Sequence, residues 1–169
     1  MIASHRVKHL FQTLWNQPHL LSGKGAAHEE SFEAFLRRMD WAPYEYTRHP
    51  NGPTKWPDFH LHPQGPTKPI AVELKTTVKN TVCMGGTWPH PECMYLITAN
   101  QLLYITKGSL LLPQADRIHY ENYRQAVQLV DRVTSTTNGS VNWSLRARTE
   151  LRITRSEEHT SELQSRVDI

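Results

Sequence analysis

Residues 57–77 read PDFHLHPQGPTKPIAVELKTT, and this stretch decides the expected fold of the chain. Phe59 and Leu61 alternate with two histidines, which is the pattern of a half-buried strand. Residues 63–69 contain three prolines and a glycine, so they predict a turn. Residues 69–77 predict a second strand. We therefore expect two neighbouring strands that pair as a hairpin.

The second of these strands has two different faces, because successive side chains of a strand point to opposite sides. One face is apolar and consists of Ile70, Val72 and Leu74, whereas Ala71, Glu73 and Lys75 lie on the other. Glu73 and Lys75 are two residues apart, so they lie roughly 6.5 Å apart on the same side. A strand anchored by an apolar face holds such a charged pair rigidly, as a reaction centre requires.

Asp58 begins the first strand, fifteen residues before Glu73, and the hairpin can bring the two carboxylates together. Like charges a few ångströms apart repel each other, and a divalent cation between them removes that conflict. Hard Mg²⁺ prefers such oxygen ligands. Lys75 beside the ion could orient an attacking water or offset charge on a phosphate. The chemistry indicated is in-line hydrolysis of a phosphodiester.

These residues resemble a known nuclease motif. Pro57-Asp58 followed by Glu73-Leu74-Lys75 is similar to the paired-strand motif of the PD-(D/E)XK nucleases, and residues 73–97 resemble the corresponding region of some type II restriction endonucleases. The resemblance implies a restriction-endonuclease-like core, an α/β fold with a mixed β-sheet flanked by helices. It also implies Mg²⁺ as cofactor, with Mn²⁺ as a substitute, and Lys75 as a catalytic residue.

The helix before the motif carries a further candidate. Gly25 and Glu29 form a GxxxE pattern, and in this superfamily a glutamate on that helix often supports the metal. The resemblance therefore implies Asp58, Glu73 and Glu29 as catalytic metal ligands. Glu30 and Glu33 compete with Glu29 for this role.

The resemblance implies an endonuclease that cleaves double-stranded DNA, with a sequence-specific type II restriction enzyme as the leading interpretation. Such an enzyme is expected to act as a homodimer, because each strand of a duplex needs one active site. A Holliday-junction resolvase or repair nuclease of the same fold, and a non-catalytic DNA-binding module, are the alternatives. A structural alternative is an exposed Glu73–Lys75 salt bridge on an edge strand.

Several other residues are candidates for binding. DNA phosphates could be contacted by Thr76, Thr77 and Lys79 after the motif, and by the basic row Arg146, Arg148 and Arg152 near the end of the chain. A zinc site is an alternative role for His60, His62, Cys83, His90 and Cys93. Because the two cysteines are ten residues apart, they lack the tight pairing of structural zinc sites. We therefore interpret His60 and His62 as polar residues near the site.

The flanking segments complete one α/β domain. Helical spacing of apolar residues predicts helices over 5–16, 26–40 and 117–134. One face of the third helix is apolar and consists of Tyr123, Ala126, Val127, Val130 and Val133. Strands are expected over 43–48, 93–99 and 101–106, and alternation predicts a last strand over 141–153.

The last fifteen residues, 155–169, read RSEEHTSELQSRVDI and resemble the in-frame translation of a sequencing adapter. We therefore expect them not to be native and place the single nuclease domain in residues 1–154. They contain two of the 19 basic and four of the 16 acidic residues, so the net charge rises from +3 to +5 without them. With no apolar leader, no membrane span and no disulfide framework, a cytoplasmic protein is expected.

Overall fold

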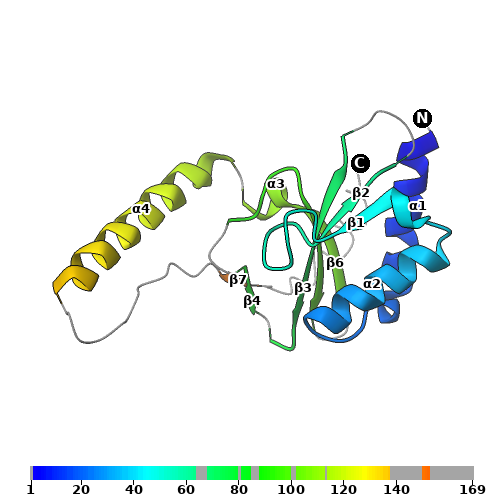
Figure 1. Ribbon diagram of the computed structural model, residues 1–169, viewed down its shortest axis with the longest axis horizontal. Coiled ribbons are helices and arrows are strands. Elements are labelled where there is room, and N and C mark those ends of the chain that lie inside the picture. Colours follow the sequence, from blue (N-terminus) through cyan, green and yellow to red (C-terminus); the bar gives the residue numbers. More distant parts are fainter. Residues whose placement is uncertain are drawn as a thin grey trace, which may run out of the picture.

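The computed structural model describes residues 2–63, 68–79, 81–84, 88–99, 102–112, 114–137 and 150–152. Two helices precede a block of strands, and a long helix and a short strand follow (Figure 1). The helices and 3-10 turns are α1 Ile2–Asn16, η1 Pro18–Leu20, α2 Ala26–Arg38, η2 Pro43–Glu45, α3 Gly108–Leu111 and α4 Gln114–Thr137. The strands are β1 Tyr46–Arg48, β2 Phe59–Leu61, β3 Ile70–Thr77, β4 Thr81–Cys83, β5 Met94–Ala99, β6 Leu102–Lys107 and β7 Glu150–Arg152.

In the described residues, five strands form one mixed sheet in the order β1-β2-β3-β5-β6. Only the β3–β5 pair is parallel, and the other three pairs are antiparallel. The expected hairpin is confirmed, because Phe59 of β2 lies opposite Val72 of β3. The expected α/β class with a mixed sheet flanked by helices is confirmed at this level.

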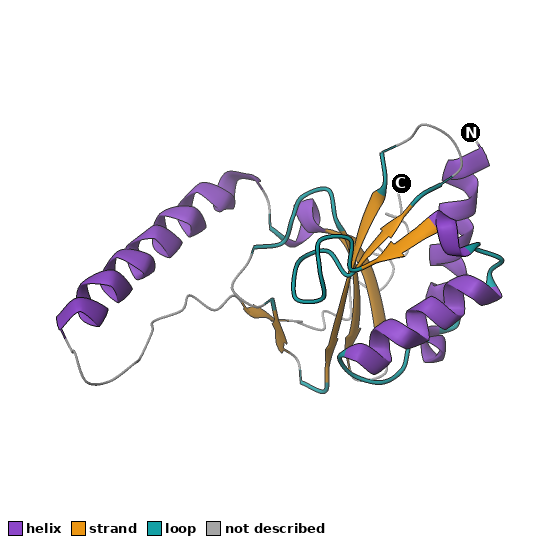
Figure 2. Ribbon diagram, viewed as in Figure 1, coloured by secondary structure: helices purple, strands orange, loops and turns teal. Residues whose placement is uncertain are grey.

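Helices α1 and α2 cover one face of the sheet (Figure 2). Their apolar residues recur every three or four positions, so each helix turns one stripe toward the strands. Phe32 of α2 meets Phe59 of β2 edge to face, with ring centroids 5.0 Å apart. Each fully buried side chain of this kind contributes about 1.5–3 kcal/mol relative to an exposed one. The large core between these helices and the sheet includes Val72 and Leu74, and it holds one face of β3 in place.

The opposite face of the sheet carries a second, smaller apolar cluster. It consists of Val82, Met84, Cys93, Tyr95 and Ile97, with Trp56, Ala71, Tyr104 and Leu111 packed against it. Alternation along β3 predicted that Glu73 and Lys75 lie on this side, but not that the side is apolar. The charged pair therefore sits at the margin of a core.

The predicted third helix corresponds to α4. It spans the predicted segment, yet it projects away from the sheet (Figure 1). The described part of its apolar face is largely exposed, because Tyr123 is 59% and Val130 49% exposed. Of the predicted last strand, β7 is the described part, and it pairs antiparallel with β4. Residues 138–149 and 153–169, which include the suspected adapter segment, lie outside the described residues.

Among the described residues, no helix combines the length and the apolar character needed to cross a membrane. Both cysteines are free thiols, Cys83 at the surface and Cys93 in the smaller core.

Candidate functional site

The strand register aligns three polar residues across β1, β2 and β3. Arg48 lies opposite Phe59, and Phe59 lies opposite Val72. Continuing both pairings by one residue places His49 opposite Asp58 and Asp58 opposite Glu73. The main chain supports this continuation, because the His49 N–H donates to the Asp58 carbonyl over 2.7 Å. Directly opposite residues have Cβ atoms about 4.5–5.5 Å apart, so the three side chains are neighbours.

Glu73 is the most buried member of this row. Its side chain is held on β3 in the middle of the sheet, and the residue is only 8% exposed. Lys75 Nζ donates to Glu73 Oε1 over 2.5 Å. Glu73 Oε2 is buried and has no hydrogen-bond partner among the described residues. The alternative of an exposed pair on an edge strand is therefore wrong, because β3 is central and Glu73 is buried.

Asp58 faces Glu73 from β2. Its Oδ2 accepts a hydrogen bond from the Leu74 N–H over 2.7 Å, which fixes the carboxyl beside β3. Burial, and after it the charge of Glu73, raise the pKa of Asp58 from its ordinary 3.8 to about 6. The Leu74 N–H and the Lys75 charge lower the pKa but do not compensate. The ionised carboxylate is therefore unfavourable here without a nearby cation.

This pKa predicts that Asp58→Asn stabilises the metal-free protein in a pH-dependent way. A carboxyl group with a raised folded-state pKa loses stability as pH rises from about 4 to 6, because the unfolded chain releases its proton first. Two pKa units correspond to about 3 kcal/mol, which partial exposure reduces to about 1–2 kcal/mol. Asparagine avoids this cost and still accepts the Leu74 N–H.

Urea denaturation in EDTA measures the effect. We expect Asp58→Asn to unfold at higher urea than the wild type at pH 8 and at nearly the same urea at pH 4. An equal difference at both pH values would show that the ionisation of Asp58 is not the cause.

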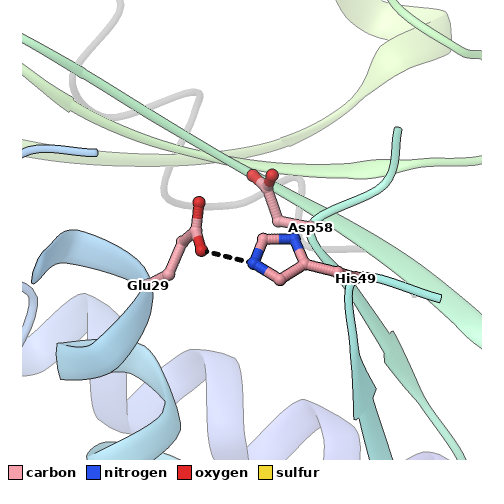
Figure 3. Close-up of side chains that lie close together, drawn as sticks. All are labelled: Glu29, His49 and Asp58. Atoms are coloured by element: carbon pink, nitrogen blue, oxygen red, sulfur yellow. Dashed lines mark ion pairs between the residues drawn. The ribbon is translucent and has the colours of Figure 1, made fainter. Parts of the chain in front are cut away.

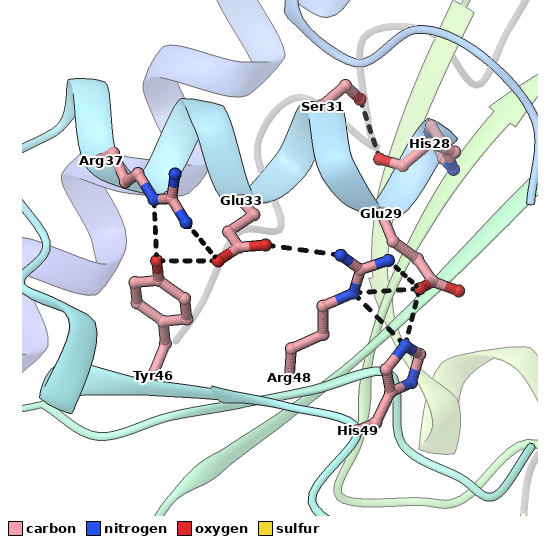
Figure 4. Close-up of polar contacts among 8 residues, drawn as sticks. All are labelled: His28, Glu29, Ser31, Glu33, Arg37, Tyr46, Arg48 and His49. Atoms are coloured by element: carbon pink, nitrogen blue, oxygen red, sulfur yellow. Dashed lines mark hydrogen bonds and ion pairs between the residues drawn. The ribbon is translucent and has the colours of Figure 1, made fainter. Parts of the chain in front are cut away.

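Glu29 reaches the row from the first turn of α2 (Figure 4). Its Oε2 lies 2.9 Å from Arg48 Nη2 and 2.9 Å from His49 Nε2. Of the competing residues, Glu30 is exposed to solvent, and Glu33 pairs with Arg37 and Arg48 one turn further along the helix. Among the three glutamates, Glu29 is therefore the one that the structure brings to Asp58.

His49 also belongs to the site, although no motif in the sequence points to it. Glu29, His49 and Asp58 each offer one ligand atom, and these three atoms lie within 4.8 Å of one another (Figure 3). His49 follows β1 directly, with a left-handed backbone (φ 50°) that starts the turn toward Gly52. This conformation is uncommon outside glycine, and histidine adopts it more readily than most residues. The only hint in the sequence is its place between a short strand and the turn-forming Pro-Asn-Gly.

The donor set fits a divalent cation. Two ligand atoms of one ion lie at most about 4.2 Å apart when each bond is about 2.1 Å, so the three groups lie close to the spacing that one ion needs. Glu73 Oε2 has no hydrogen-bond partner among the described residues, and the pKa of Asp58 is raised, so a cation beside these carboxylates would favour their ionised forms. Glu29, His49 and Asp58 are the described residues whose ligand atoms lie close enough together to share an ion, and Glu73 lies beside Asp58 on the next strand.

The proposed zinc ligands are not brought together. Among the described residues, none of His60, His62, Cys83, His90 and Cys93 joins a group of metal-ligating side chains. The His62 ring instead contacts the Thr47 hydroxyl over 2.9 Å. Burial raises the pKa of the Cys93 thiol to about 12, which disfavours the thiolate that zinc needs.

The predicted DNA-contacting residues have different positions. Thr77 Oγ1 accepts the Lys79 N–H and donates to the Thr81 carbonyl, so this hydroxyl closes the turn after β3. Thr76 is half-buried at the end of β3, and Lys79 is exposed beyond it. Arg152 lies in β7, whereas Arg146 and Arg148 lie outside the described residues. Lys79 remains the candidate best placed to meet a phosphate.

No protein-family model, curated protein or solved structure matches this chain. The function is therefore argued from the geometry of the row formed by His49, Asp58 and Glu73, together with Lys75 and Glu29.

Proposed function

We propose that the chain is a metal-dependent endonuclease that hydrolyses phosphodiester bonds of double-stranded DNA. The observation that carries the proposal is the convergence of Asp58, Glu73 and Lys75 at one place on two paired strands. Two carboxylates and a lysine in a partly buried position form a costly arrangement for stability alone, because ionised groups resist burial. Their presence is explained if they hold a cation and a phosphate.

Each residue has a part in the proposed reaction. Asp58 and Glu73 would hold the ion, and Glu29 would support the site from α2. Lys75 orients the attacking water or places its positive charge beside the phosphate. Its position is set by the hydrogen bond to Glu73, so the ammonium group is oriented before substrate binds. A divalent cation held there would supply Lewis-acid stabilisation of the charge that develops on the phosphate oxygens.

Sequence-specific cleavage by a homodimer, as in type II restriction enzymes, is the form of this activity that we propose. Cleavage of both strands needs two such sites, and a two-fold dimer presents them to a palindromic sequence. Sedimentation analysis with and without duplex DNA measures the number of chains in the active species. A monomer that makes double-strand breaks in a single binding event would contradict the dimer.

Cleavage of plasmid DNA tests the proposal and separates its alternatives. The wild-type protein is incubated with Mg²⁺ or Mn²⁺ on a mixed plasmid panel, and in parallel on four-way DNA junctions. Discrete plasmid fragments support restriction, whereas a preference for the junction supports a resolvase. Binding without cleavage in either metal would overturn the nuclease and leave a DNA-binding module. Undiminished cleavage in excess EDTA would overturn the metal dependence.

A further inference from the structure

The His49 ring carries a hydrogen on Nδ1 in both forms that its contacts allow. Arg48 Nε donates to His49 Nε2 over 3.3 Å, so Nε2 of the neutral ring is the acceptor and the proton is on Nδ1. Nε2 also lies 2.9 Å from Glu29 Oε2, a contact that is an ion pair when the ring is protonated. The protonated ring has a hydrogen on each nitrogen. Nδ1–H is therefore a donor in either form, and it has no lone pair for a cation.

This donor is buried and has no hydrogen-bond partner among the described residues. A buried polar group without a partner costs about 1–3 kcal/mol. Figure 3 shows the second ring nitrogen on the side of Asp58. His49 and Asp58 also belong to the group whose ligand atoms lie within 4.8 Å of one another. Rotation about the side-chain torsions of Asp58 can therefore bring an acceptor to this N–H.

Both residues are held close together by other bonds. The His49 main-chain N–H donates to the Asp58 carbonyl over 2.7 Å. The ring is held on its other side by Arg48, which is itself paired with Glu29 and Glu33 of α2. Asp58 Oδ2 accepts the Leu74 N–H, which leaves Oδ1 for a second donor.

From this geometry we propose that His49 is a positioning residue for Asp58. Its Nδ1–H donates to Asp58 Oδ1 when that carboxylate holds a divalent cation, so the carboxylate is fixed by Leu74 on one side and by His49 on the other. Ligating carboxylates are themselves hydrogen-bonded, and loss of such a partner typically costs about 10–100-fold in metal affinity or activity. The inference deepens the proposed function and rests on it for the role of Asp58 as a ligand.

Two substitutions separate the two ends of the ring. In His49→Asn the amide N–H₂ takes the place of Nδ1 and faces Asp58, and asparagine tolerates the left-handed backbone of this position (φ 50°). In His49→Gln the longer side chain places its amide near the position of Nε2, beside Arg48 and Glu29, and leaves Asp58 without the donor.

The affinity of the full chain for Mn²⁺ is measured from the electron paramagnetic resonance signal of the free ion. We expect His49→Asn to bind Mn²⁺ within about threefold of the wild type and His49→Gln to bind about 10–100-fold more weakly. His60→Gln makes the same change at a half-buried histidine of β2 and should bind as the wild type does.

Nuclear magnetic resonance of the wild type provides a second measurement that needs no variant to bind metal. Long-range ¹H–¹⁵N spectra of the chain labelled with ¹⁵N-histidine show which ring nitrogen carries hydrogen, and the signal missing in His49→Asn identifies His49. We expect Nδ1 to carry a hydrogen with and without Mg²⁺. Its proton resonance should move downfield when Mg²⁺ is added, because the N–H then gains an acceptor.

The outcomes separate the inference from the proposed function. An Nδ1 without hydrogen in the Mg²⁺-bound protein, an Nδ1–H resonance unchanged at saturating Mg²⁺, or a folded His49→Gln that binds Mn²⁺ as tightly as the wild type would overturn the role of His49. The nuclease would still stand if that protein cleaves DNA. Absence of Mn²⁺ and Mg²⁺ binding would overturn the inference, and absence of cleavage as well would overturn both. The wild-type spectra decide the question even if His49→Gln does not fold.

Discussion

Glu73→Gln is expected to lower the single-turnover rate of DNA cleavage by about 10³-fold or more, while the protein remains folded. The glutamine retains the size of the side chain and an oxygen that accepts the Lys75 hydrogen bond. It removes the negative charge that would hold the cation, and stabilisation by a cation is worth several kcal/mol in the transition state. Each 1.36 kcal/mol corresponds to a tenfold change in rate.

A matched variant tests whether the same change of charge lowers cleavage when it is made outside the site. Glu30→Gln makes the same chemical change on an exposed position of α2 and should cleave at the wild-type rate. The melting temperature of Glu73→Gln should not fall, because the amide replaces an oxygen that has no described partner. A variant that is folded and cleaves within about tenfold of the wild type would remove Glu73 from the site.

Lys75→Ala is expected to lower the cleavage rate by roughly 10²-fold or more, the range of a lost general base or charge stabiliser. Affinity for DNA in Ca²⁺ should fall far less, because one phosphate contact among many is a small part of the electrostatic binding energy. The two quantities are measured as a single-turnover rate and an equilibrium dissociation constant. A loss in the rate alone places Lys75 in the chemical step.

Two further lysine variants sharpen this prediction. Lys79→Ala removes an exposed lysine four residues away and should affect binding more than rate. Lys75→Arg keeps the charge, yet the guanidinium does not release its proton and is broader than an ammonium group, so we expect slow cleavage. Because Lys75→Ala leaves buried Glu73 without its cation, the rate is measured well below the melting temperature of the variant. A near wild-type rate in Lys75→Ala would remove the catalytic role.

The sequence predicted the paired strands because alternation and turn chemistry act over short distances. Phe59 and Leu61 need one buried face, and the prolines between the strands prevent any other element from forming. The phase of β3 then places Glu73 and Lys75 on one side without knowledge of the remaining chain. For the same reason Asp58 could be placed near Glu73 before its bond to Leu74 was known.

His49 and the smaller core could not be predicted in this way, because both depend on contacts between distant segments. His49 is one of ten histidines, and only the register of β1 against β2 brings it to Asp58. The apolar cover over Glu73 comes from β4, β5 and Trp56, which no local pattern links to β3. Periodicity correctly indicated the helix α4, but it does not show whether an apolar face such as that of Tyr123 is covered.

The most direct test compares nicking of supercoiled plasmid by the wild type and by Asp58→Asn, purified side by side, in Mn²⁺ and in EDTA. The parallel purification matters because a contaminating nuclease would be present in both preparations. We expect nicking by the wild type in Mn²⁺ alone, and none above background by Asp58→Asn, whose fold and DNA binding are retained. Equal nicking by both proteins, or none by a folded wild type that has bound metal and DNA, would contradict it.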